Sequence, residues 1–166
     1  MAATVIITEK NGPSGTKTNK TSGTIRFKLA DDAVVDNANP VGIPASGAAY
    51  SMEKVVRLEV TAAPTTQIAD VVAYTDGSSD FGIGVSMLYK VTDSFVEPTI
   101  PADATGLSDL FAHASGNPIS LEATNAGPFT VLGEIGDHLV LTLAVADTAE
   151  PGPLTAETLT FSYTET

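Results

Sequence analysis

Short stretches of alternating apolar and polar residues run through the chain, separated by connections rich in glycine and proline. A period of two is typical of strands that bury one face. The pattern predicts strands at residues 4–9, 24–30, 51–62, 67–75, 82–92, 118–124, 128–134, 138–146 and 156–164. The segment 138–146, "HLVLTLAVA", is apolar almost throughout, which indicates a central strand covered on both faces. We therefore expect an all-β fold, a β-sandwich or jelly-roll-like architecture.

One segment has helical spacing instead. Its apolar positions follow an i, i+3, i+4 pattern at Leu107, Leu110 and Phe111. Thr105 is placed to cap the first turn, and a glycine follows at 116. We expect one short helix around residues 106–115.

Charge divides the chain unevenly. Residues 1–29 hold five basic residues and one acid, whereas the remainder holds three basic residues and 19 acids, for a net charge of −12. At 166 residues the chain fits a single domain. We expect a strand and a basic flexible arm at 1–23, and the sandwich at 24–166. The predicted partner-binding residues, facing acids on a neighbouring subunit, are Lys10, Lys17, Lys20, Arg26 and Lys28.

The same composition disfavours several functions. An acidic surface is a poor match for nucleic acid, whose phosphates need clustered lysine and arginine. No apolar run approaches the roughly 20 residues of a membrane helix, so no membrane association is expected. There is no cysteine for a disulfide or a thiolate site. The opening "MAATVIITEKNG" has no signal-peptide pattern, so we expect synthesis in the cytoplasm.

The stretch "AYTDGSSDFGIGVSMLYK" raises the question of a metal site. Asp76, Ser78 and Asp80 alternate as in a calcium loop, but no acid follows to complete one. Asp-Gly is also a hairpin signal. We favour a hairpin tip joining the strands at 67–75 and 82–92, and expect no metal.

No enzyme is expected, and no cofactor. The two histidines, His113 and His138, have no nucleophile elbow of the form G-x-S-x-G to serve. Asp137 beside His138 would point to the opposite face of a strand. A hydrolase with a hidden carboxylate pair remains an alternative.

Several segments together resemble small structural proteins of tailed bacteriophages. They are "TVIITEKNGPSG", "GTIRFKLAD", "YSMEKVVRLEVTAAP", "YTDG" and "ETLTFSYTET". The resemblance implies a virion component, most specifically a capsid decoration or cement protein that binds the shell exterior and stabilises it. Its implied partners are the major capsid protein or other virion subunits, and further copies of itself in a homo-oligomer, for which a trimer would fit.

Two other binding functions stay open. A tail-tube or neck subunit would have a similar β-rich fold. A carbohydrate- or cell-surface-binding module would use exposed aromatic side chains, for which Tyr50, Phe81 and Phe95 are candidates.

Overall fold

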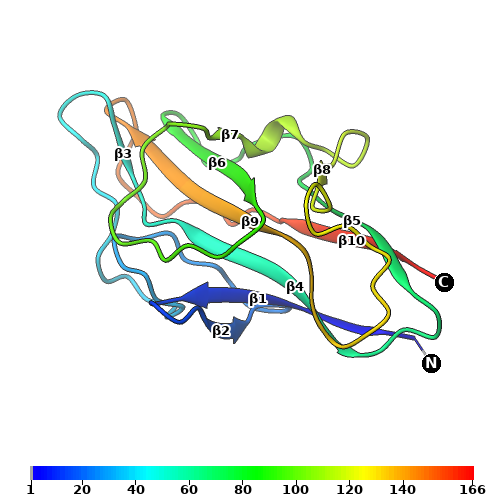
Figure 1. Ribbon diagram of the computed structural model, residues 1–166. Coiled ribbons are helices and arrows are strands. Elements are labelled where there is room, and N and C mark those ends of the chain that lie inside the picture. Colours follow the sequence, from blue (N-terminus) through cyan, green and yellow to red (C-terminus); the bar gives the residue numbers. More distant parts are fainter. Residues whose placement is uncertain (1) are drawn as a thin grey trace.

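The chain folds into two packed antiparallel β-sheets (Figure 1). The computed structural model describes residues 2–166. The strands are β1 (Thr4–Asn11), β2 (Thr16–Asn19), β3 (Ala48–Tyr50), β4 (Lys54–Ala62), β5 (Ile68–Tyr74), β6 (Val85–Thr92), β7 (Ser108–Asp109), β8 (Ile119–Ser120), β9 (Gly133–Ala146) and β10 (Thr160–Glu165). The larger sheet has the order β2-β1-β4-β9-β6-β7, with β3 also on β9, and the smaller has the order β10-β5-β8. The expected all-β sandwich is confirmed.

β9 is the central strand, as its sequence predicts. It pairs with β4 on one side and β6 on the other, with Val56 opposite Leu139 and Met87 opposite Leu143. It is buried along almost its whole length. The connection between β6 and β7 crosses the outer face of this sheet (Figure 1), where the amide of Ala102 donates to Ser51 O. β9 is therefore covered on both faces.

The inner face of the larger sheet is covered by two different kinds of structure. The smaller sheet packs on one half, where Val71 and Ala73 of β5 join the apolar core. The other half lies under irregular chain: residues 20–47, which we call the strap, and residues 150–158, which we call the rim segment. Both ends of the chain lie at one end of the sandwich (Figure 1), where the amide of Ala3 donates to a Glu165 carboxylate oxygen at 2.7 Å.

The expected helix at 106–115 is reduced to one turn. Residues 108–109 form β7 on the edge of β6, and Leu110–Ala112 form a single 3₁₀ turn. Asp109, not Thr105, is the cap, and its carboxylate accepts the Phe111 amide at 3.0 Å. Leu110 and Phe111 still reach the core from this turn. Within residues 2–166, no helix is long and apolar enough to cross a membrane.

Three predictions about strands and hairpins were wrong. β5 and β6 do not form a hairpin, because they belong to different sheets and residues 75–84 cross between the layers. The expected strand at 24–30 is irregular, and Lys28 within it forms an ion pair with Asp32 of the strap. Residues 128–134 give only a bridge at Phe129 before β9 begins. The segment 11–23, expected as a flexible arm, contributes β2 to the larger sheet.

Candidate functional site: an apolar groove beneath an ion-paired strap

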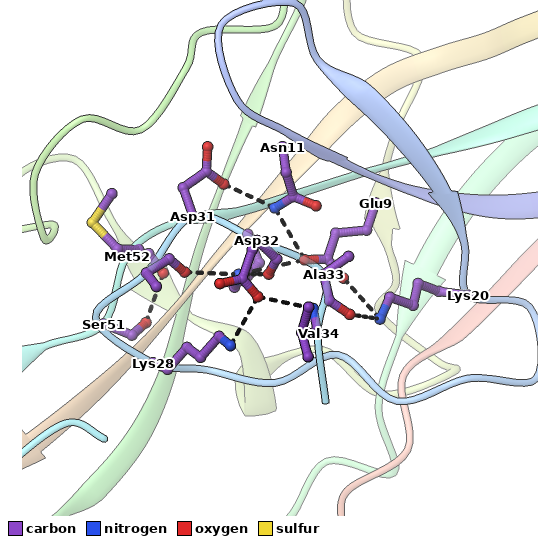
Figure 2. A network of polar contacts seen from close by, with 12 residues as sticks. Glu9, Asn11, Lys20, Lys28, Asp31, Asp32, Ala33, Val34, Ser51 and Met52 are labelled. Carbon is purple, nitrogen blue, oxygen red and sulfur yellow. Dashed lines mark hydrogen bonds and ion pairs between the residues drawn. The ribbon is translucent and has the colours of Figure 1, made fainter. Parts of the chain in front are cut away.

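A buried carboxylate lies at the centre of the contacts between the larger sheet and the strap. β1 alternates so that Val5, Ile7 and Glu9 share the inner face, and Glu9 stands opposite Val56. Glu9 is 0% exposed. Its carboxylate lies 3.3 Å from Lys20 Nζ and 3.4 Å from Lys54 Nζ, and Figure 2 shows the surrounding polar network. We call these three residues the clasp.

The two lysines of the clasp bind the strap backbone. Lys54 Nζ donates to the carbonyl oxygens of Ala30 and Asp32, at 3.2 and 2.6 Å. Lys20 Nζ donates to those of Thr24 and Ala33, at 2.9 and 2.8 Å. One carboxylate thus orients two ammonium groups that together hold four carbonyl oxygens. This satisfies polar groups that the strap would otherwise bury unpaired.

A second set of contacts fixes the strap to itself and to β1. Asn11 Nδ2 donates to Asp31 at 2.8 Å, and Lys28 Nζ lies 2.8 Å from Asp32 (Figure 2). Lys28 Nζ is also 3.0 Å from Asp36. The hydrogen bond to Asp32 raises the pKa of Lys28 and lowers the pKa of Asp32. The strap is therefore held by fully charged groups at neutral pH.

Another ionic cluster occupies the outer face of the larger sheet, around Glu134. Lys10 Nζ and Lys17 Nζ lie 2.7 and 3.1 Å from its carboxylate, and Arg57 Nη1 lies at 3.0 Å. Burial would raise the pKa of Glu134, but hydrogen bonds from the two lysines outweigh it and lower that pKa. His138 Nε2 is 3.0 Å from Lys10 Nζ, and burial followed by the charges of Arg57 and Lys10 lowers the pKa of His138 to about 4.

The structure gives internal partners to the residues predicted to bind another subunit. Lys10, Lys20 and Lys28 are buried in the ion pairs described above. Lys17 is partly exposed on the Glu134 cluster, and Arg26 is exposed with a hydrogen bond to Asn37. That these residues bind another subunit stays a prediction. It now depends on Lys17 and Arg26, the two whose side chains are exposed to solvent.

An apolar groove of about 840 Å³ lies between the inner sheet face, the strap and the rim segment. Its floor is formed by side chains of β6, β9 and β10, chiefly Val85, Met87, Leu141, Leu143, Val145 and Phe161. This size lies within the range of typical ligand sites, which are likewise mostly apolar. The groove exists because the small sheet covers only half of the floor.

The two segments that frame the groove also carry much of the exposed apolar surface. Within residues 2–166, ten large aliphatic side chains are exposed: Leu29, Val34, Val35, Ile43, Ile83, Val96, Ile100, Val131, Leu132 and Leu154. The first four lie on the strap and the last on the rim segment. The groove could not be predicted from the sequence, because it depends on which half of the sheet remains uncovered.

The other candidates from the sequence have structural partners. Asp76 accepts the Ser78 amide at 3.0 Å, as in an Asx turn, and the Asp80 amide donates to Glu157. Within residues 2–166, no group of three or more histidine, aspartate or glutamate residues is placed to hold a metal. The ring of Phe81 packs edge-on against Phe111.

Each of the two histidines contacts polar groups of its own chain. His113 lies between the Tyr89 hydroxyl, at 2.7 Å, and the carbonyl oxygen of Asn117, at 2.9 Å. His138 is enclosed in the Glu134 cluster, and its Nδ1 has no hydrogen-bond partner among the described residues. Asp137, its neighbour, binds the amides of Thr124 and Asn125 instead. The sequence pair therefore does not form an acid–histidine dyad.

Comparisons with known protein families, curated proteins and solved structures find no match to this chain. The assignment of a function therefore depends on the geometry described above and on the resemblance of the sequence segments.

Proposed function

We propose that this protein is a structural subunit of a tailed-phage virion, and most specifically a capsid decoration protein that binds the shell exterior and stabilises it. The observation that carries the proposal is the apolar groove together with the aliphatic side chains that frame it. Five of the ten exposed aliphatic residues lie on the strap and the rim segment. Two of these five, Ile43 and Leu154, line the groove itself, and exposed apolar surface beside a groove is typical of a site for another protein or a ligand.

The charge distribution supports the same function. Residues 30–166 hold 19 acids against three basic residues, which favours solubility before assembly. Two of the five basic residues in the first 29 positions, Lys20 and Lys28, fasten the strap. The strap is thus an irregular segment presented on a rigid two-sheet body, which suits a subunit that attaches to a preformed surface.

Immunogold electron microscopy of phage particles tests this proposal. Antibodies raised against the purified protein are applied to particles from a lysate in which it is produced, with pre-immune serum as the control. Label on the shell exterior supports a decoration protein. Label confined to tails favours the tail-tube or neck alternative, and particles without label refute a virion role.

A second measurement separates the two virion locations. Purified protein is examined by light scattering and negative-stain microscopy. Rings or tubes that form without other components would favour a tail subunit, whereas a small discrete species agrees with a decoration protein.

A further inference from the structure

We propose that the groove binds an extended, basic polypeptide segment of a partner subunit, which adds a strand between the strap and the rim segment. This inference rests on the proposed function, because it names how such a subunit would recognise its partner. Its occupant is defined by chemistry: alternating apolar side chains facing inward and lysine or arginine facing outward.

The floor has the spacing of a strand. Leu141, Leu143 and Val145 are alternate residues of β9 that face the groove. Alternate residues of a strand are about 6.6 Å apart, and an extended peptide above them repeats its side chains at the same interval. Each inward side chain of the occupant can therefore pack between two floor residues. An aliphatic chain without this periodicity would pack less closely against the floor residues.

The edges of the groove can recognise a polypeptide backbone. Among the described residues, no backbone group of 150–158 or of 40–46 takes part in a backbone–backbone hydrogen bond. The rim segment leads directly into β10, whose only partner in its sheet is β5. Pro40, Pro44, Pro151 and Pro153 have no amide, but the other amides and the carbonyl oxygens of these segments are free of backbone partners, and such groups beside a free strand edge are what β-augmentation uses. A lipid or other apolar small molecule would leave these groups to water.

The charges at the groove favour a basic occupant. The two lysines that line it, Lys20 and Lys28, lie in ion pairs with acids of the clasp and the strap. Three lining charges lie in no ion pair among the described residues: Glu150, Glu157 and Arg26. These unpaired groups carry one net negative charge, on a chain whose net charge is −12. Cations on the outward edge of the occupant would complement this field.

Fluorescence anisotropy with synthetic peptides tests the proposal. The probe is a labelled peptide in which lysine and valine alternate over about nine residues, long enough to span the floor. A matched peptide has the same composition with all valines contiguous, and a third is the alternating peptide with N-methyl groups along one edge. We expect the alternating peptide to bind best. N-methylation should weaken it at least about tenfold, because several backbone hydrogen bonds are lost.

Two protein variants test the location. Val85→Trp fills the groove and should reduce binding at least about tenfold, provided that its melting curve remains cooperative. Glu150→Lys changes an exposed rim charge without disturbing the fold, and should weaken binding more than the matched Glu97→Lys on the connection between β6 and β7. Equal binding of the alternating and contiguous peptides, or no effect of either groove variant, overturns the proposal.

Other occupants give distinct results. Binding that survives N-methylation but is displaced by an apolar dye indicates a small-molecule pocket and overturns the proposal. A protein that is already oligomeric, and binds no peptide until dissociated, has its groove filled by a second copy, which also overturns it. Neither result affects the immunogold labelling, so this inference can fail while the virion role stands.

Discussion

Replacing the buried carboxylate of the clasp is expected to loosen the strap and destabilise the fold. In Glu9→Gln the amide keeps the shape of the side chain but leaves Lys20 and Lys54 without the charge that lies 3.3 and 3.4 Å away. Both lysines are nearly inaccessible to water, so their ammonium groups cannot be resolvated in place. Breaking a buried ion pair from one side costs about 3–5 kcal/mol. That is a large share of the roughly 5–15 kcal/mol that stabilises a typical domain.

Urea unfolding followed by far-ultraviolet circular dichroism measures this loss. The matched control is Glu59→Gln, which removes the carboxylate of a partly exposed pair with Lys17 and should cost less than about 1 kcal/mol. Limited trypsin digestion gives a local reading, because a loosened strap exposes the bond after Arg26. If Glu9→Gln is no more destabilising than Glu59→Gln, the clasp does not hold the strap as described.

A double-mutant cycle tests whether Glu9 and Lys54 are energetically coupled. Removing both charges, as in Glu9→Leu with Lys54→Met, should recover part of the stability lost in Glu9→Leu alone, because one uncompensated buried charge disappears. No recovery in this double-mutant cycle would mean that the two side chains are not coupled.

Three further predictions concern the other features of the fold. His138 has a pKa of about 4 in the folded protein against an ordinary 6.5, so the unfolded chain binds the proton first as the pH drops. The free energy of unfolding should therefore fall between about pH 7 and 4, by up to about 3 kcal/mol. Urea titrations over this range should show a shallower decline in His138→Gln, and identical slopes would contradict the prediction. Gly136→Ala and Gly12→Ala both place a side chain at positive φ, but only at Gly136 does the new Cβ meet a backbone oxygen at 2.7 Å. Gly136→Ala should therefore lose more stability in urea unfolding than Gly12→Ala, by about 1 kcal/mol or more. Equal losses would disprove the clash. Calcium should not change the melting temperature of the native protein or of the double variant Asp76→Asn, Asp80→Asn, because these residues form part of a turn. A calcium-dependent rise in the native protein alone would support a metal site instead.

Part of the clasp could have been predicted from the sequence. Glu9 follows Val5 and Ile7 at intervals of two, and Lys54 precedes Val56 and Leu58 in the same way. An acid on the apolar face of one strand and a lysine on the apolar face of another are each a costly choice, and such groups are tolerated inside only when they are paired. The pairing itself needs the register of β1 against β4.

The sequence alone determined the class of fold and the identity of its central strand. Alternation at 4–9 and 51–62 and the apolar run at 138–146 are local properties, so they identified β1, β4 and β9 correctly. Tertiary structure decided which sheet each strand joined, and it separated β5 from β6 across the Asp76 turn. It also decided that the basic N-terminal side chains face acids of their own chain, because ion pairs join residues far apart in the sequence. The groove follows from the same cause: a strand pattern shows that a face is apolar, and only packing decides what covers it.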